Sequence, residues 1–337
     1  MIKKHLDRKS LKNTVIDGHS HIGVEIKMYC RGEYPYAQTA EGIYYKQLSS
    51  KVDVNVVFPF SVDLYCEPIK LLDSQRVPAK EPLSDVPYKV ENLILMREVF
   101  DYCPELSTRF ITFISVDPAR DVSGQLEELK KLEEKYPIYG IKVNPVGCQS
   151  KASELLGKGK AFLDFAAQRD IPLVFHATTA PNDEYSQASD IFKIVEQRPD
   201  LRFCFAHCLL FNQEFLERAK QSPNVWVDTA AFKIQVDLVN QLIEDNVINR
   251  KALIDADFSD YRKVMTTLCQ MYSDTIVWGT DSPAYTYNCR RLQGYDIYQD
   301  FSLKGRYEDE VMALRTLSSD IQKKISNQNT LDFIFGN

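Results

Sequence analysis

The sequence predicts an α/β protein whose residues 1–337 form one domain, a (β/α)8 TIM barrel. Short apolar and β-branched runs alternate with longer helical patterns along the whole chain, as repeated βα units do. Several of the short runs are almost continuously apolar, which is typical of parallel strands buried on both faces. An open, doubly wound sheet is the alternative, but no Gly-x-Gly-x-x-Gly motif follows any predicted strand.

Eight runs have the length and composition of strands, and amphipathic segments lie between them. The predicted strands are residues 14–17, 54–58, 110–116, 138–143, 173–175, 202–206, 225–227 and 276–278. In residues 124–136, leucines three positions apart alternate with charged residues, which predicts a helix with one apolar face. Similar patterns predict helices at 161–169, 189–196, 262–271 and 308–317.

Two segments do not fit the βα repeat, and each follows one of the first two strands. Residues 25–45 are rich in Tyr, Gly and Pro, and residues 61–88 carry four prolines. Both lie on the C-terminal side of strands, where barrel active sites form. We therefore expect long loops that shape a substrate pocket. The alternative is that both segments are surface loops at a subunit contact.

Composition indicates which classes of partner and which cellular compartment to expect. The net charge is −6 and no basic tract is present, which argues against nucleic acid as a partner. No apolar run reaches the roughly 18 residues that a membrane span needs, and no apolar segment follows the charged N-terminus as in a secretory signal. Eight scattered cysteines without a Cys-x-x-Cys pair fit a reducing cytoplasm. We expect a cytoplasmic protein that acts on a small molecule, with a homo-oligomer left open.

Four of the five histidines lie where predicted strands end. His19 and His21 are two residues apart near the end of the first strand, so their side chains point to the same face. His176 and His207 end the fifth and sixth strands, and Asp281 follows the eighth. Imidazole and carboxylate groups are ligands for divalent transition metals. The pattern therefore predicts a metalloenzyme.

The residues around these positions resemble the amidohydrolase superfamily, in particular amidohydrolase family 2, the branch that includes aminocarboxymuconate-semialdehyde decarboxylase. The resemblance rests on seven segments, which are 16–23 (IDGHSHIG), 113–118 (FISVDP), 140–145 (GIKVNP), 172–176 (PLVFH), 206–207 (AH), 278–283 (WGTDSP) and 327–336 (NQNTLDFIFG). They occur in the expected order over nearly the whole chain. Only the two long loops match nothing in the family.

The resemblance implies a site with one divalent metal ion, zinc being the first candidate. His19, His21, His176 and Asp281 would be its ligands, and zinc would lower the pKa of a bound water to about 7. Asp281 would also take a proton from that water, and His207 would act as a second catalytic group that polarises the substrate or moves a proton.

Lys142, at the end of the fourth strand, has two interpretations. In other branches of the superfamily such a lysine is carbamylated and bridges two metals, and His176 and His207 would then bind the second ion. Otherwise Lys142 is an ammonium that binds a substrate carboxylate or pairs with a carboxylate of the site. Arg290 and Arg291, shortly after the eighth strand, could also bind an anionic substrate.

Two further aspartates have open roles. Asp17 shares a face with the first histidine pair, and it could support the metal ligands or simply be a buried, hydrogen-bonded strand residue. Asp228 ends the seventh strand, and a functional role for it is one interpretation among others.

The expected reaction is hydrolysis of a small, anionic lactone, amide or ester by a metal-activated water. Nonoxidative decarboxylation of an aromatic or enol acid is the alternative, because the same ligands support it. The first-strand pair is His-x-His, not the Glu-x-His that we associate with several decarboxylases of this branch, and this favours hydrolysis. A metal-binding scaffold or sensor is less consistent with His207, because a structural site is closed and needs no extra base.

Overall fold

A computed structural model of the chain describes residues 5–26, 37–72, 75–241, 250–284, 286–293 and 296–336, without the side chains of 72, 241 and 286–303. In this part of the chain, eight strands form one parallel sheet in the order β1-β4-β5-β6-β7-β8-β9-β10. Their bounds are β1 Ile16–His21, β4 Val54–Phe58, β5 Phe110–Val116, β6 Gly140–Val143, β7 Leu173–Phe175, β8 Phe203–Phe205, β9 Val225–Asp228 and β10 Ile276–Val277. The sheet closes on itself, so the predicted (β/α)8 barrel is confirmed.

The last strand meets the first through backbone contacts. The Gly18 N–H donates to the carbonyl of Trp278 at 2.9 Å, and Ser20 and Ser282 form an isolated parallel bridge. The second, third and fifth strands have the bounds that the sequence predicts. The first differs, because β1 begins two residues later than predicted and runs on through His21. Both histidines of the first strand are therefore part of the barrel wall.

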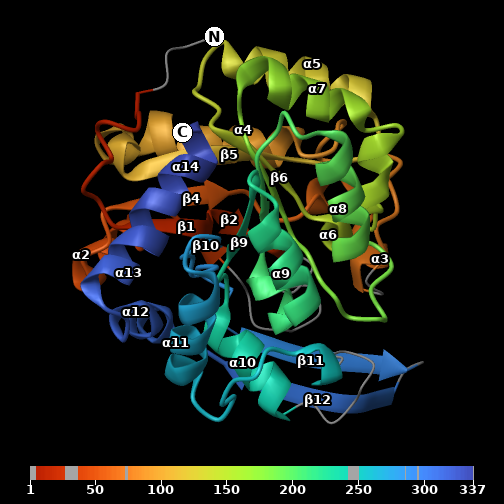
Figure 1. The fold of residues 1–337 in the computed structure, drawn as a ribbon. Helices are drawn as coiled ribbons and strands as arrows, with labels where there is room; N and C mark the ends of the chain where they lie inside the picture. The colour runs from red at the N-terminus through yellow and green to blue at the C-terminus, as the bar shows by residue number, and fades with distance from the viewer. Residues whose placement is uncertain are drawn as a thin grey trace.

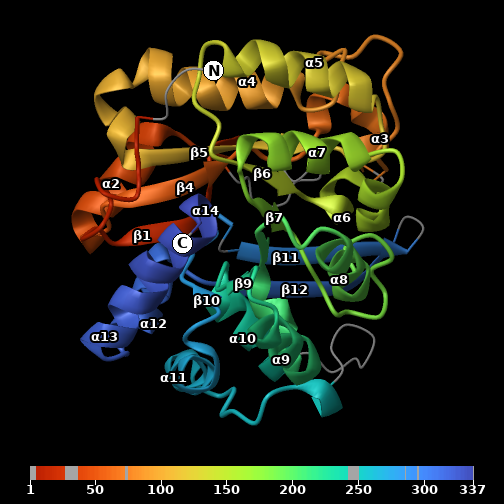
Figure 2. The same cartoon turned by 45° about the horizontal axis from the view of Figure 1, so that its top comes forward.

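Helices surround the strands, as Figures 1 and 2 show. Within the described residues they are α2 Ala40–Ser50, α3 Pro68–Leu72, α4 Lys89–Arg97, α5 Val122–Glu133, α6 Pro145–Cys148, α7 Lys160–Arg169, α8 Ala188–Gln197, α9 Gln213–Gln221, α10 Phe232–Gln241, α11 Tyr261–Tyr272, α12 Tyr307–Arg315, α13 Ser319–Lys323 and α14 Asn329–Phe335. Each predicted helix is present, with ends that differ by at most three residues. None of the described helices is long and apolar enough to cross a membrane.

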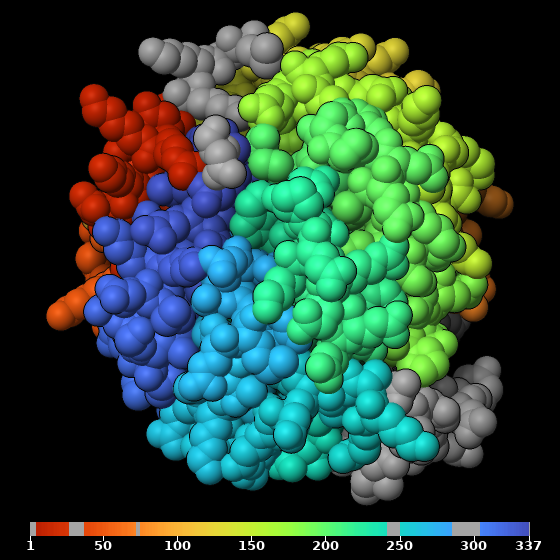
Figure 3. Space-filling view, in the orientation of Figure 1, coloured from red at the N-terminus to blue at the C-terminus, as the bar shows by residue number. Residues whose placement is uncertain are grey.

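The C-terminal helix α14 closes the N-terminal end of the barrel. The ring of Phe333 lies 5.7 Å from that of Trp226 and 6.3 Å from that of Phe113, between centroids. The N-terminal segment covers α14 from outside, since Arg8 donates to the carbonyl of Gly336. Figure 3 shows these first and last parts of the chain side by side on one face. The cavity that holds the predicted site residues lies at the other end, where the strands have their C-termini.

The two loops that the sequence predicts after the first strands carry short elements of their own. The segment after the first strand includes the antiparallel pair β2 Gly23–Val24 and β3 Ala37–Gln38, while residues 27–36 lie outside the described part. The predicted extent of this loop, 25–45, was too long, because Thr39 caps α2 and the helix begins at Ala40. Residues 61–88 include α3 and one isolated bridge, between Cys66 and Pro78.

A hairpin that the sequence analysis did not predict follows the barrel. Strands β11 Thr286–Gln293 and β12 Asp296–Lys304 pair with each other and lie beside α10 (Figure 1). Arg290 and Arg291 belong to β11, but their side chains are outside the described part of the structure. Their predicted role in substrate binding stays a prediction.

Candidate metal centre

Six of the predicted site residues line one cavity at the C-terminal end of the barrel. They are His19, His21, Lys142, His176, His207 and Asp281. The cavity has a volume of about 310 Å³. Its outer wall includes Glu25 and Ser61, one from each of the two loops that follow the first strands. Parallel strands end at one rim of the barrel, which explains why residues so far apart in the sequence meet here.

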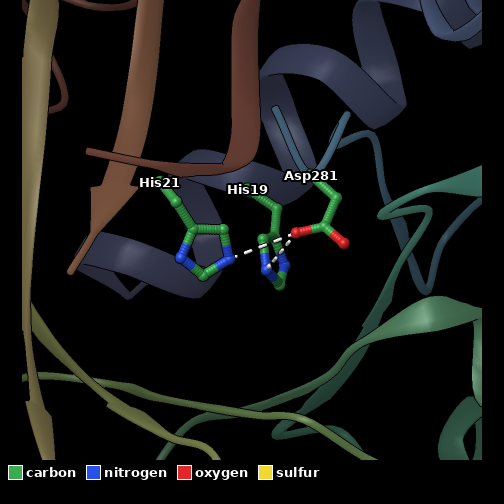
Figure 4. A group of neighbouring side chains, drawn as sticks. All are labelled: His19, His21 and Asp281. Carbon is green, nitrogen blue, oxygen red and sulfur yellow. Dashed lines mark ion pairs between the residues drawn. The ribbon is translucent and has the colours of Figure 1, made fainter. Parts of the chain in front are cut away.

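His19, His21 and Asp281 form a cluster of possible metal ligands (Figure 4). One ligand atom from each lies within 4.8 Å of the others. The Asp281 Oδ1 atom is 3.2 Å from His21 Nε2 and 3.4 Å from His19 Nε2. Two imidazole nitrogens and one carboxylate oxygen are a donor set that suits a divalent transition metal.

The backbone fixes this cluster as well. The Asp281 N–H donates to the carbonyl of His19 at 2.7 Å, and the His21 N–H donates to the carbonyl of Ser282 at the same distance. Asp281 has a φ of +62°, which is uncommon for a residue with a Cβ and often marks a functional position. The segment after β10 is therefore bound to β1 at the point where the ligands meet.

Protonation states in the cluster favour metal binding. Burial lowers the pKa of His19 well below its usual value, and the charge of Lys142 adds to this effect. Burial acts to raise the pKa of Asp281, but the hydrogen bond from His21 and the neighbouring imidazoles outweigh it, so that pKa is lowered. A neutral imidazole and an ionised carboxylate are the forms that bind metal ions.

Asp17 is a buried, hydrogen-bonded residue next to the cluster. Its carboxylate is fully buried and accepts hydrogen bonds from the backbone of His19 and Thr280 and from the side chains of Ser20, Asn55 and Thr280. Burial raises the pKa of Asp17 to about 6 against the effect of these hydrogen bonds. The contacts join β1, β4 and the segment after β10, and they include the backbone of the proposed ligand His19, so both predicted interpretations stay open.

Asp228 contacts two of the site histidines, His19 and His207. Its Oδ2 atom is 2.7 Å from Nδ1 of His19, and its Oδ1 atom accepts the backbone N–H groups of His207 and Ala230. The sequence left the role of Asp228 open. Its position at the end of a predicted strand indicated that it could lie near the site. The sequence pattern does not show which atoms the carboxylate contacts.

His176 does not belong to the three-residue cluster. Its Nδ1 atom instead lies 2.9 Å from Nε2 of His207, whose Nδ1 lies 3.1 Å from the carbonyl of Ala230. Burial lowers the pKa of His176 well below its usual value, with His207 contributing. The structure thus brings three of the four predicted ligands into one cluster and pairs the fourth with His207.

Lys142 faces the same cluster. Its Nζ atom is 3.1 Å from Nε2 of His19 and lies 5.0 Å from the centre of the Phe58 ring. Burial lowers the pKa of Lys142, although Asp228 and Asp281 act in the opposite direction. A buried lysine with a lowered pKa fits a substrate-binding ammonium as well as a carbamylated bridge, so both predicted interpretations stay open.

A left-handed turn begins at His207. Residues 207–211 have φ values of +62°, +51°, +50°, +50° and +57° in sequence, and none of them is glycine. This conformation costs roughly 1–2 kcal/mol for each residue with a Cβ. All five residues are buried, so packing around the turn has to offset that cost. The turn sets the direction in which His207 enters the cavity.

Comparisons with known proteins agree with this architecture. The amidohydrolase family model matches residues 95–334, while a search of curated proteins finds no match. Among solved structures, an uncharacterised TIM-barrel protein from Bordetella bronchiseptica is 12% identical, with a TM-score of 0.54 over 94% of this chain and 96% of that one.

Two further structures share the fold. IDCase from Metarhizium anisopliae, in its apo form, is 12% identical, with a TM-score of 0.52 over 96% of this chain and 97% of that one. An amidohydrolase II is 11% identical, with a TM-score of 0.55 over 95% and 99% of the two chains. At such identities the likeness concerns the fold of the chain.

Proposed function

This chain belongs to the amidohydrolase family, and from that premise we propose that it is a metal-dependent hydrolase of a small lactone, amide or ester. The observation that carries the proposal is the His19, His21 and Asp281 cluster, whose ligand atoms lie within 4.8 Å of one another in the cavity of the barrel. Two further histidines and a lysine line the same cavity.

A divalent ion, with zinc as the first candidate, would be held by His19, His21 and Asp281. His176 is the proposed fourth ligand. Such an ion polarises a carbonyl oxygen and acidifies a water molecule. The alternative arrangement has a carbamylated Lys142 and a second ion, and the 2.9 Å separation of His176 Nδ1 and His207 Nε2 is compatible with it.

His207 is the proposed group that moves a proton. When its Nδ1–H donates to the carbonyl of Ala230, its Nε2 carries the lone pair, which faces Nδ1 of His176 at 2.9 Å and would turn from that contact to a substrate. An imidazole in this state can accept a proton and then return it to a leaving group. Asp281 is ionised and can accept a proton from water on the same side of the cavity.

The proposed substrate is small and carries an anionic group. The cavity volume of about 310 Å³ is at the lower end of the range for small-molecule sites. Lys142 lies in the wall of the cavity, where an ammonium could hold a carboxylate. Arg290 and Arg291 are the other proposed anion-binding residues.

Nonoxidative decarboxylation of an aromatic or enol acid is the second candidate, as in the branch that includes aminocarboxymuconate-semialdehyde decarboxylase. The position of Lys142 beside His19 favours it, because a cation there could hold the carboxylate that leaves. The hydrolase and the decarboxylase would use the same residues for different steps.

A screen of the two substrate classes tests the reaction. The purified, zinc-loaded protein is incubated with lactones and amides that carry a carboxylate, with their neutral analogues, and with aromatic and enol acids. Products are followed by mass spectrometry, with Asp281→Asn as the inactive control. We expect each lactone to give one product heavier by one water, each amide to give an acid and an amine whose masses together equal the substrate plus one water, and a preference for the carboxylates. Release of carbon dioxide without hydrolysis would favour the second candidate, and equal turnover of neutral analogues would contradict the anionic substrate.

A further inference from the structure

Asp228 lies outside the cavity but contacts both halves of the site. The residue is 1% exposed and is not among those that line the cavity. One carboxylate oxygen meets the ring of His19 at 2.7 Å, and the other accepts the backbone N–H of His207 at 3.2 Å and that of Ala230 at 3.0 Å. Because Asp228 cannot reach a substrate, any effect on chemistry has to act through these histidines.

The contact with His19 determines which ring nitrogen of His19 is free. A carboxylate accepts from Nδ1–H, which leaves the lone pair on Nε2. That Nε2 atom is the one near Asp281, at 3.4 Å, and near Lys142 Nζ, at 3.1 Å. A carboxylate behind a metal-binding histidine fixes its tautomer and its orientation in this way.

The contact with His207 lies at the start of the left-handed turn. Asp228 Oδ1 accepts the N–H of the first of five consecutive residues with positive φ. The next turn residues make other contacts, among them the Leu209 carbonyl with Thr179 Oγ1 at 3.3 Å. The hydrogen bond to Asp228 therefore acts on the residue whose side chain enters the cavity.

We propose that Asp228 is a positioning residue that couples the two halves of the site, with His19 held by one oxygen and His207 by the other. The proposal deepens the proposed function and rests on it for the role of the two histidines. A purely structural role would require only that the buried carboxylate satisfy backbone donors, as other buried aspartates in this chain do.

Asp117 provides the matched control. It is fully buried and accepts the backbone N–H groups of Ala119 and Arg120, but it does not line the cavity. Asp228→Asn and Asp117→Asn therefore both remove a buried carboxylate that caps backbone donors, and Asp117→Asn also removes an ion pair with Arg120. Only the first of them meets His19.

Asn at position 228 has a specific consequence. Its single carbonyl oxygen is needed by the N–H groups of His207 and Ala230, so its NH₂ group would face Nδ1 of His19. That arrangement favours a proton on Nε2 of His19, which removes the lone pair that a metal requires. Loss of a supporting contact of this kind typically weakens metal binding by about 10–100-fold.

The test measures zinc affinity by chelator competition and the ring ¹⁵N signals of the five histidines in metal-free protein, for the wild type, Asp228→Asn, Asp228→Ala and Asp117→Asn. We expect Asp228→Asn to bind zinc at least about tenfold more weakly and to shift the signal of His19, with those of His207 and His5 unchanged because Asn keeps the acceptor for the His207 N–H. Asp228→Ala removes that acceptor as well and should shift the signals of both His19 and His207. Asp117→Asn should lower stability and leave zinc affinity and these signals alone.

Three results would overturn the proposal. They are unchanged zinc affinity in Asp228→Asn, an unchanged His207 signal in Asp228→Ala, and equal effects of Asp228→Asn and Asp117→Asn. If Asp228→Asn does not fold, the wild-type spectrum decides, since a His19 proton on Nε2 contradicts the proposed contact and one on Nδ1 supports it. A wild type that binds no zinc would instead contradict the proposed function, so the two failures are distinguishable.

Discussion

The five histidines of this chain have very different environments. Four line the cavity, while His5 is exposed and lies 2.9 Å from the carbonyl of Ser107. Strand-end positions in the sequence were enough to predict that the four would meet, because the strands of a barrel end at one rim. The sequence did not predict the pairing of His176 with His207 or the contact of Asp228 with His19. Such contacts depend on rotamers and on the packing of neighbouring strands, which periodicity does not record.

His207→Asn should retain the bound metal and lose turnover. The variant removes an imidazole that is proposed to move a proton and leaves the three-residue cluster intact, so we expect a decrease of about 10²–10⁴ in kcat. Metal content and steady-state kinetics are measured together, with His5→Asn as the control that should behave like the wild type. If His207→Asn loses its metal along with its activity, His207 is a ligand and the assigned role is wrong.

At the level of elements, the site depends on how closely β1 approaches the segment after β10. A Cβ on Gly279 would lie 2.7 Å from the Cβ of His19, and one on Gly18 would lie 2.6 Å from the Val277 side chain. Both distances are too short for any residue with a Cβ. The glycines therefore let His19 and Asp281 come together. The sequence showed strand ends on both sides of this contact, but only the structure shows that the strands touch there.

Gly279→Ala should separate β1 from this segment and weaken metal binding. We expect a loss of about 1–3 kcal/mol in the free energy of unfolding, as in other overpacked cores, and lower zinc affinity because His19 moves away from Asp281. Gly42→Ala, in α2, is the control, since a Cβ there would meet only the side chains of Thr39 and Gln38, at ordinary contacts of 3.4 Å or more. Urea unfolding and chelator competition give the two readouts. Equal zinc affinity in Gly279→Ala and the wild type would show that this close approach does not position the ligands.

At the level of the whole molecule, the packed, closed end of the barrel and the candidate site lie at opposite ends. The N-terminal end of the barrel is closed by α14 and the N-terminal segment, and the site residues gather at the opposite end. The alternating pattern of the sequence predicted the barrel because each βα unit repeats the same period. It did not predict the β11–β12 hairpin, and it gave only the position of the two long loops. These segments lack a repeat, so their structure follows from tertiary contacts.

The central claim is that His19, His21 and Asp281 hold a divalent metal ion, and the metal content of the purified protein tests it most directly. Elemental analysis of the wild type, His21→Ala and Asp281→Asn, with His5→Asn as the control, should give one divalent ion per chain in the wild type and the control and a large loss in the other two. Chelation should remove the ion, and zinc should restore it. A result of two ions per chain with a carbamylated Lys142 would mean that the site holds a bridged pair of metals and not a single ion. A wild type without a bound divalent ion, or His21→Ala and Asp281→Asn variants that keep it, would contradict the claim.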